Sequence, residues 1–567
     1  MYRTLKHRTI PRFLRAKNVS SYSVVLLVIP LVLSAITHIW NPVGFPSIHN
    51  DEGHYIRRGI HVSEGLGAQE ASSRYDHPYF GWLFLGSIFS TLNFPDFLSA
   101  KSGDVGSIEA VWSIPRIIMG LLAVVDTFLI YKIAQTRFNR YTAFIAAVIF
   151  AVTPSSWLTR SVFLESILLP LLLLSIFFAI SFGTNLSRRS NEVIRTDGSR
   201  RTRDNIDANG NTFKQIILVS ISGIFLGLAI FAKVPTFSFI PLVGFLVYIG
   251  SKNNQENEAK DKAILGIYKN RSKSRKNSLK VLVLWLIPVV FIPLIWPAFA
   301  IFHGQYEDWL EGINFQSTRT SKPLVDHVRE LFSLDPILLI VGIAGIGYSA
   351  VTRREFLFLI WIAPFLIFLY LIDYVSSFFS IPIIPPLCIA AALMIVDLSS
   401  RIFKNRNRIK KLLPFGIVSV IAILGLMDTT VSISGSENSN YLQVAAAVTR
   451  QLPADNGFQD GGEANQDGQV TVIGNPRFYW IFQYVYDRPN FNYKTQYNLI
   501  NIHALEKMMD GSEKVIMIAD KGMLEIVTGE RSPDNAKAAQ RAERLSEIYA
   551  GTELEEKIDD VEIRTNY

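Results

Sequence analysis

The sequence predicts a polytopic α-helical membrane protein with about 11 transmembrane helices, followed by a small C-terminal α/β domain. The chain of 567 residues is 49% hydrophobic and only 18% charged, which is typical of a multi-pass membrane protein rather than a soluble one. Apolar runs long enough to cross the hydrocarbon core, about 20 residues each, recur up to residue 435. Residues 436–567 then have the mixed composition of a soluble domain.

The first predicted span follows a basic N-terminal segment. Residues 1–21 contain six lysines and arginines, and the apolar run after them has no clear cleavage site of small residues. We therefore expect a retained span and a cytoplasmic N-terminus rather than a cleaved signal peptide. By the same length rule we predict spans at residues 22–40, 113–133, 141–158, 165–183, 214–232, 234–250, 280–301, 335–351, 356–374, 378–398 and 412–431.

Residues 77–94 are also apolar enough to span, and the distribution of basic residues decides their placement. If this run lies along the membrane interface, the basic loops that follow residues 133, 183, 250, 351 and 398 all face the cytoplasm. A spanning run would turn every one of them outward. We therefore predict a juxtamembrane helix at 77–94 within an outer loop of residues 41–112. The transmembrane domain is then 22–435, in the cell membrane, and domain 436–567 is extracytoplasmic.

The net charge of +8 is concentrated in the same loops, so it indicates membrane orientation and not a nucleic-acid partner. Two polar insertions, residues 184–213 and 251–279, are poor in apolar residues. We expect both to be mobile and to contact anionic lipid. The single cysteine, Cys388, lies in an apolar run and excludes an internal disulfide.

The C-terminal domain has its own charge and pattern. Residues 436–567 contain 13 basic and 21 acidic residues, a net charge of −8. Residues 470–474 and 514–519 are predicted strands, and residues 442–452 and 533–549 are predicted helices. The loop DGGEANQDGQ resembles a calcium-binding loop in composition only, because its acidic residues lack the spacing of an EF-hand.

The richest cluster of polar residues lies just past the first span, in residues 46–81. Such a cluster at a membrane edge carries a large free-energy cost unless its charges are solvated, paired or part of a functional site. Its adjacent carboxylates, Asp51 and Glu52, point in different directions, so one can face a reaction centre while the other holds a partner. Nearby arginines and desolvation tune the pKa of a carboxylate for general-base work. The alternative is a solvated turn with paired charges.

Histidines form the second feature of this loop. In Asp76-His77-Pro78 the proline restricts the backbone and therefore the direction of His77, which can hydrogen-bond a phosphate or a carboxylate. His54 is a supporting residue nearby. Coordination of a divalent metal by Asp51, His54 and His77 is conceivable, but their spacing is not diagnostic, so we predict no metal site.

Charges at the outer ends of spans form the third feature. They are Arg116, Arg160, Glu165 and Lys233. Lys233 lies in a hairpin with almost no outer loop, beside a helix break at Pro235, so its ammonium group is expected near the headgroup plane. A cation at that depth can neutralise a phosphate leaving group. The alternative for each residue is an ion pair or a side chain that snorkels to the interface.

Six stretches in order carry a resemblance to a known family. They are HNDEGHY, YDHPYFG, SIPRIIMGLL, LTRSVFLESILLPLLLL, GLAIFAKVPTF and SFFSIPIIPPLCIAAAL, within about residues 20–400. The chain resembles the GT-C glycosyltransferases of the superfamily of dolichyl-phosphate-mannose protein mannosyltransferases and aminoarabinose lipid A transferases. The resemblance implies a membrane enzyme that transfers a sugar, most simply a mannose-like hexose, from a polyprenyl-phosphate donor with inversion. The acceptor is a protein, a lipid or a glycan, and no cofactor is firmly implied.

The resemblance also assigns residues in the first outer loop. The Asp-Glu pair of the family is matched by Asp51 and Glu52, with the aspartate as base. The family's His-Pro-Pro-Leu or Lys-Pro-Pro-Leu segment is matched from His77 and Pro78 onward, with one proline kept. The arginine at the start of the next span is matched by Arg116. His77 and Arg116 are thereby candidates for binding the donor phosphate.

Two later elements complete the set. The family's Arg…Leu-Leu-Asp element is matched by Arg160 and Glu165, with glutamate in place of aspartate. Its Thr-Lys-Gly-Pro element is matched by residues 232–235, which keep Lys233 and the proline. Arg160 and Lys233 are thus further candidates for the phosphate. Phe379 and Ser380 stand where the family often has Arg or His and Tyr.

Other classes of protein are distinguished by features of the sequence. An oligosaccharyltransferase should show a Trp-Trp-Asp-Tyr-Gly type element, which the stretch NPRFYWIFQYVYD lacks. A transporter or flippase of lipid-linked glycans should carry charges near the bilayer midplane and an inverted repeat, and no repeat is visible. A scaffold without chemistry leaves the Asp-Glu pair and Lys233 unexplained. The transferase is therefore the primary hypothesis and the flippase the alternative.

Overall fold

The computed structural model of the chain describes residues 21–70, 75–193, 204–264, 271–319, 323–352, 355–372, 376–403, 405–435, 438–452, 470–485, 491–495, 514–533 and 536–567. The basic N-terminal segment and the loop that resembles a calcium site lie outside these residues. We call the end of the helical bundle next to the C-terminal domain the outer end.

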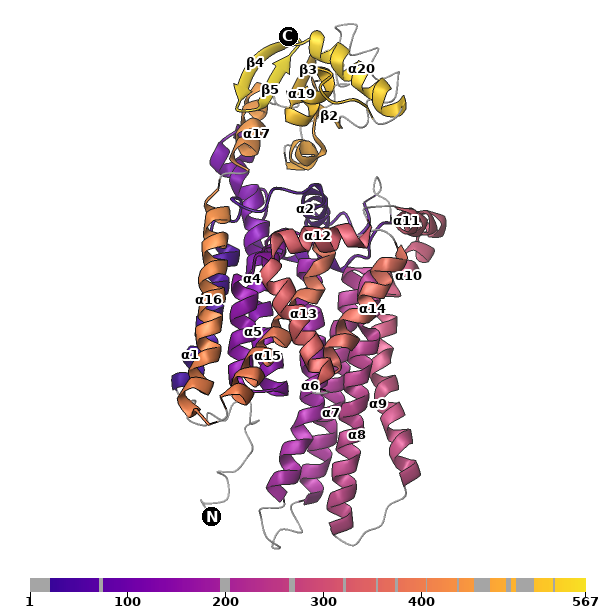
Figure 1. The fold of residues 1–567 in the computed structure, drawn as a ribbon. Coiled ribbons are helices and arrows are strands. Elements are labelled where there is room, and N and C mark those ends of the chain that lie inside the picture. The colour runs from indigo at the N-terminus through magenta and orange to yellow at the C-terminus, as the bar shows by residue number, and fades with distance from the viewer. Residues whose placement is uncertain are drawn as a thin grey trace, which may run out of the picture.

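Long apolar helices run side by side between the two ends of the bundle (Figure 1). They are α1 (Ser21–Ile39), α4 (Val105–Arg137), α5 (Arg140–Val152), α6 (Leu164–Val193), α7 (Asp204–Ala232), α8 (Ile240–Ile264), α9 (Arg271–Phe291), α13 (Pro336–Val351), α14 (Leu357–Ile372), α15 (Ile384–Ile402) and α16 (Asn407–Ser434). Each predicted span overlaps one of these helices, and the predicted span 280–301 continues past the end of α9 at Phe291. Within the described residues, six helices are long and apolar enough to cross a membrane, or up to nine if bent pairs count as single spans. The predicted polytopic fold class is confirmed.

Short 3-10 segments follow or precede several helices at the outer end. They are η2 (Pro154–Arg160), η3 (Val234–Phe239) and η4 (Ser377–Ile383). Each has a proline inside it or in its first turn, and proline has no N–H for the helical ladder. The α5–η2 pair is bent by 68°. These breaks place Arg160, Lys233 and Phe378 at the ends of helices rather than within them.

Shorter elements lie across the outer end (Figure 1). They are α2 (Asn50–Ser63), α3 (Phe80–Leu92), η1 (Ala100–Ser102), α10 (Ile295–Phe302), α11 (Tyr306–Thr318) and α12 (Leu324–Leu334). With 13 residues, or about 20 Å, α3 is too short to span, and it falls within the predicted juxtamembrane segment. Glycines let α2 and α3 approach closely, because a Cβ at Gly59 would lie 2.8 Å from the ring of Phe89.

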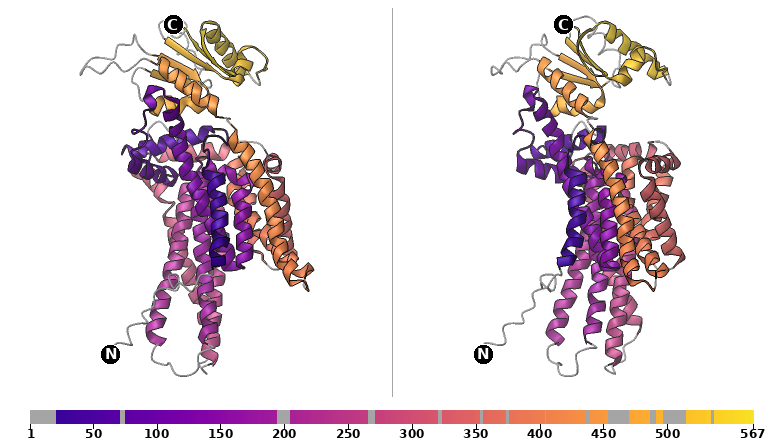
Figure 2. Two further views of the ribbon diagram at one scale, coloured as in Figure 1. Left: turned by 90° about the vertical axis from the view of Figure 1, so that its left-hand side faces the viewer. Right: turned by 60° about the vertical axis from the view of Figure 1, so that its left-hand side comes forward.

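The polar insertions lie at the opposite end of the bundle, and their mobility and contact with anionic lipid stay predictions. Their described residues continue the neighbouring helices, since α6 reaches Val193 and α7 begins at Asp204, while α8 reaches Ile264 and α9 begins at Arg271. Figure 2 shows these helices extending beyond the rest of the bundle. Once an apolar segment has nucleated a helix, each added residue costs little, so polar composition alone does not end it.

The C-terminal domain is the predicted small α/β domain. Its strands are β1 (Val470–Gly474), β2 (Phe491–Thr495), β3 (Lys514–Ala519), β4 (Glu553–Ile558) and β5 (Val561–Thr565), in the order β2-β1-β3-β5-β4. β1 is parallel to β2 and β3, and β5 is antiparallel to β3 and β4. The other elements are α17 (Ser439–Gln451), η6 (Pro476–Phe478), η7 (Ile481–Val485), α19 (Lys521–Val527) and α20 (Ala536–Ala550). β2, β4 and β5 were not predicted, and the β4 sequence ELEEKI has no alternating apolar face.

Aromatic side chains join this domain to the bundle. The indole of Trp480 lies edge-on to that of Trp112 on α4, with ring centroids 4.7 Å apart. It also covers Gly53 of α2, where a Cβ would lie 2.1 Å from the ring. Tyr441 of α17 stacks on Phe478 at 4.2 Å. The domain is therefore packed directly on α2, the helix that carries the Asp-Glu pair.

Candidate active site

Glu52 and Arg116 form a closed ion pair in the core. Both side chains are fully buried. Arg116 donates from Nη2 to Oε1 of Glu52 at 2.7 Å and from Nε to Oε2 at 2.9 Å. Oε1 also accepts the N–H of His49 at 3.0 Å, and Oε2 accepts that of Val162 at 2.9 Å. Four hydrogen bonds thus satisfy a carboxylate that lies away from water, as a buried charge requires.

The remaining nitrogen of Arg116 is engaged as well. Nη1 donates to the carbonyl oxygens of Pro42 at 3.0 Å and Pro46 at 2.9 Å. The N-terminus of α2 is closed by a capping box between His49 and Glu52. Arg116 therefore ties α4, the stretch 42–46 and the start of α2 into one unit, and all three of its side-chain nitrogens are used in doing so.

Arg160 is also engaged with backbone atoms. The buried guanidinium donates from Nη1 to the carbonyl oxygen of Thr37 at 3.1 Å. Nη2 donates to those of Trp40 at 2.8 Å and Asn41 at 2.6 Å. These carbonyls lie at the C-terminal end of α1, where a cation complements the helix dipole. Arg160 fixes the exit of the chain from α1 toward α2.

Asp51 differs from its neighbour Glu52, because 36% of its side-chain surface is exposed. In the described part of the chain its carboxylate has one long polar contact, with Nδ1 of His49 3.9 Å from Oδ1. That nitrogen accepts the backbone N–H of Asp51 at 3.2 Å, so it carries no proton for the carboxylate. A carboxylate with access to water and no firm donor is free to accept a proton.

Tyr55 lies one helical turn after Asp51, on the same face of α2. Its ring is buried, and its centroid lies 6.1 Å from that of His77. Burial raises the pKa of Tyr55 well above its ordinary value, and the carboxylates of Asp51 and Glu165 raise it further. The hydroxyl therefore keeps its proton and can donate a hydrogen bond. The i, i+4 spacing of Asp51 and Tyr55 is the signal in the sequence that places both side chains on one face.

His77 is neutral in this environment. Burial is the main cause that lowers the pKa of His77 to about 4. The nearby cations of Lys233 and Arg58 also lower this pKa, whereas the carboxylates of Asp76 and Asp51 raise it. A neutral His77 can offer an anion a hydrogen bond but no full positive charge. The buried Pro78 follows it directly, and α3 begins at Phe80.

The loop that carries His77 is held by an ion pair. Arg58 donates from Nη1 to Oδ1 of Asp76 at 2.8 Å, and its guanidinium lies over the ring of Trp82 at 4.7 Å. Burial alone would raise the pKa of Asp76, but Arg58 lowers it to about 2. Asp76 is thus a firm anion that anchors His77 to α2. Nothing in the sequence indicated this pairing across 18 residues.

Lys233 is buried and forms an ion pair with the buried Glu165. Its ammonium group lies over the rings of Phe378 at 4.7 Å and Phe379 at 4.6 Å. Oε2 of Glu165 is buried without a hydrogen-bond partner among the described residues. Phe379, which stands where the family often has a polar residue, therefore faces the lysine together with Phe378, and the two rings hold its charge by cation–π contact.

A chain of contacts joins Lys233 to Asp51. The ring of Phe378 lies 6.0 Å from that of His49, and His49 stands beside Asp51. The structure thus gathers Asp51, His77, Lys233 and Glu165 around one region of the outer end, with Tyr55 among them. It places Glu52, Arg116 and Arg160 in the supporting layer beneath. His54 points to solvent and has no hydrogen bond or ion pair with a described residue.

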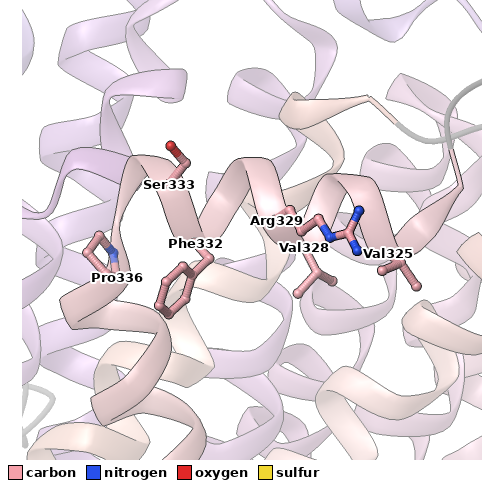
Figure 3. Close-up of a pocket in the computed structure, with 6 residues that line it drawn as sticks. All are labelled: Val325, Val328, Arg329, Phe332, Ser333 and Pro336. Atoms are coloured by element: carbon pink, nitrogen blue, oxygen red, sulfur yellow. The ribbon is translucent and has the colours of Figure 1, made fainter.

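No group of three or more His, Cys, Asp or Glu side chains within the described ranges is arranged to hold a metal ion. A shallow groove of about 590 Å³ lies instead along α12. In Figure 3 its apolar side chains, Val325, Val328 and Phe332, lie on one side of the helix, with Arg329 beside them. Leu324 and Leu331 of the same helix pack against the core.

Comparison with known proteins identifies the architecture as a GT-C membrane fold, which confirms the fold predicted from the sequence. The chain is similar to ArnT from Cupriavidus metallidurans in the apo state, with a TM-score of 0.51 and 12% identity, over 97% of this chain and 98% of that one. For ArnT from the same organism bound to undecaprenyl phosphate, the TM-score is 0.50 and the identity is 11%. That match covers 96% of this chain and 98% of the ArnT chain. For the oligosaccharyltransferase of Archaeoglobus fulgidus in the apo form, the TM-score is 0.48 and the identity is 15%. That match covers 90% of this chain and 70% of the oligosaccharyltransferase chain. No protein-family model and no curated protein matches the sequence.

Proposed function

We propose that the chain is a membrane glycosyltransferase that moves a sugar from a polyprenyl-phosphate donor to an acceptor, with inversion at the anomeric carbon. The observation that carries this proposal is the pair of unlike groups at the outer end: the water-accessible carboxylate of Asp51 and the buried cation of Lys233. Transfer from a sugar phosphodiester needs one group to take a proton and another to stabilise the departing phosphate. The GT-C fold supports the proposal, and one ArnT structure contains undecaprenyl phosphate.

The reaction assigns a distinct role to each side chain of the site. Asp51 removes the proton from the acceptor hydroxyl or amine, which attacks the anomeric carbon from the side opposite the phosphate. The bond between that carbon and the phosphate oxygen breaks, and the phosphate leaves as an anion. Lys233 binds this anion in exchange for Glu165, and neutral His77 donates a hydrogen bond to it. Tyr55 orients the attacking group by donating to it or to Asp51.

The buried arginines and Glu52 act indirectly in this scheme. The Glu52–Arg116 pair holds the start of α2, and Arg160 holds the end of α1, so these residues fix the position of Asp51. We therefore assign them positioning roles in place of the phosphate contacts that the resemblance implied. The groove on α12 supplies an apolar surface for the lipid chain of the donor, because α12 also contacts η4 beside Lys233.

The proposal also covers the substrates and the orientation of the protein in the membrane. A mannose-like hexose is the first donor to test, and the acceptor is a protein, a lipid or a glycan. We place the protein in the cell membrane with the N-terminus cytoplasmic and the C-terminal domain extracytoplasmic. The reaction requires no resident cofactor in this scheme.

A transfer assay in nanodiscs tests the proposal. Purified protein is supplied with mannosyl, glucosyl and aminoarabinosyl polyprenyl phosphates carrying radiolabelled sugars, and membrane extracts serve as acceptors. We expect transfer by the wild type and by Glu109→Gln, an exposed carboxylate on α4 that serves as control, but not by Asp51→Asn. Absence of transfer from every donor, together with movement of lipid-linked glycan across proteoliposomes, would favour the flippase alternative.

A further inference from the structure

Two exposed cations stand at one edge of the outer domain's sheet. Arg477 follows β1 by three residues and Lys521 follows β3 by two, and both side chains are exposed. Neither forms an ion pair with a described residue, whereas Arg564 and Lys557 of the same domain contact Glu562. The domain as a whole is acidic, so these cations are not a general property of its surface.

The topology of the sheet makes this edge a position where ligands bind in related architectures. Within the parallel part of the sheet, β1 lies between β2 and β3, and all three strands are parallel. The connections therefore diverge at the carboxyl ends of β1 and β3, which is where open α/β sheets bind their ligands. Asn475 and Asp520 meet there, with Nδ2 donating to Oδ2 at 2.9 Å.

The loop after β1 is also rigidly connected to the candidate active site. The hydroxyl of Tyr493 donates to the carbonyl oxygen of Asn475 at 2.7 Å, and that of Tyr441 donates to the carbonyl oxygen of Arg477. Three residues after Arg477, Trp480 covers Gly53, which is two residues from Asp51. The stretch NPRFYW, which matches no element of the family motif, thus bridges the sheet edge and α2.

We propose that residues 475–480 together with Lys521 form an acceptor-recognition site that binds a carboxylate or phosphate group carried by the acceptor. This inference rests on the proposed transferase function and names the class of acceptor. Arg477 pairs with the anion in a bidentate manner and Lys521 adds a second positive charge. Because Trp480 fixes the loop against α2, an acceptor held at Arg477 presents a neighbouring hydroxyl or amine toward Asp51.

Binding is measured without any donor, so it does not depend on catalysis. The full chain is placed in phosphatidylcholine nanodiscs and titrated with fluorescent trigalacturonate, which carries carboxylates, and with equally labelled maltotriose, which is uncharged. In a second arm, phosphatidic acid in the nanodisc competes with the probe. Displacement identifies a lipid headgroup as the source of the anion, and unchanged binding identifies a soluble glycan.

We expect trigalacturonate to bind at least about ten-fold more tightly than maltotriose, and Arg477→Gln to remove this difference. Lys521→Gln should weaken binding by roughly three-fold, because it contributes charge without bidentate geometry. Lys514→Gln, at the other end of β3, is the matched control and should leave affinity unchanged. Asp51→Asn should also bind the probe normally.

Equal affinity for the two probes, or equal effects of Arg477→Gln and Lys514→Gln, would overturn the inference. The outcome is separable from that of the transfer assay. If the wild type transfers no sugar but binds trigalacturonate through Arg477, the catalytic proposal fails while the anion site stands. If transfer is observed and depends on Asp51, but binding does not depend on Arg477, only the acceptor site is rejected.

Discussion

Asp51 and Glu52 are adjacent in the sequence, yet they belong to two regions of opposite character. Glu52 lies in a closed region, where Arg116 and two backbone N–H groups satisfy its carboxylate. Asp51 lies in an open region, with solvent access and, among the described residues, a single long polar contact, to His49. A carboxylate that is fully hydrogen-bonded stabilises a structure, whereas one without a firm donor remains available for proton transfer. The closed region thus holds the open one in position.

The largest expected effect is on the open region. Asp51→Asn should lower the rate of sugar transfer by about 10²- to 10⁴-fold, because the variant cannot accept a proton in the transition state. The thermal midpoint of unfolding should stay at the wild-type value, since no firm contact is lost. Single-turnover transfer measures the rate, and heat unfolding of the same nanodisc sample measures the thermal midpoint. A variant that loses stability in parallel with activity would place Asp51 in the closed region instead.

Substitutions in the closed region should lower the stability of the protein. Glu52→Gln or Arg116→Met alone should lower the free energy of unfolding by about 3–5 kcal/mol, because each leaves its partner charged and buried without its counterion. The double variant should lose less than the sum of the two, since neither charge is then unpaired. Denaturation monitored by tryptophan fluorescence gives the comparison, with Glu109→Gln as the exposed control. Additive losses would show that the pair is not coupled.

Lys233 and Glu165 should shift donor binding in opposite directions. Lys233→Gln should weaken binding of undecaprenyl phosphate by about ten-fold or more, because a charge-assisted contact to the phosphate is lost. Glu165→Gln should strengthen it, because the anion that competes for the ammonium group is removed. Binding to nanodisc-embedded protein is measured by quenching of tryptophan fluorescence. Weaker binding in both variants would mean that Lys233 does not exchange partners.

The smallest expected effect concerns pH. The pKa of His77 is about 4 in the folded chain, below the value of about 6.5 in an unfolded chain. His77 is therefore neutral from pH 5 to 8, and affinity for undecaprenyl phosphate should show no step attributable to it in that range. If His77 bound as a cation, affinity in the wild type but not in His77→Gln would fall as pH rises past about 6.5.

The same shift has a consequence for stability. The unfolded chain takes up a proton at His77 near pH 6.5, whereas the folded chain does so only near pH 4. This residue therefore favours unfolding increasingly as the pH falls from about 6.5 toward 4, and has no effect above that window. His77→Gln should lose less stability than the wild type over that interval, measured by the thermal midpoint at pH 4.5 and pH 7.5.

Much of the fold followed from local patterns in the sequence. Apolar runs of about 20 residues located every long helix, because a lipid environment forces the backbone to satisfy its own hydrogen bonds. Continuous apolar runs likewise located β1 and β3. The exposed, charged strand β4 had no such signal, and it exists because β5 supplies its hydrogen bonds. The GT-C fold was similarly visible in the order of short motifs.

The sequence by itself determined which residues could carry chemistry at the outer end: Asp51, Glu52, His77 and Lys233 were all singled out from type and position. Only the tertiary structure decided their states. The ion pairs Glu52–Arg116 and Lys233–Glu165 each join residues more than 60 positions apart, and no periodicity reports such a contact. Whether a carboxylate is a base or a structural anchor depends on the donors that folding brings to it, because desolvation and hydrogen bonding set its free energy of protonation.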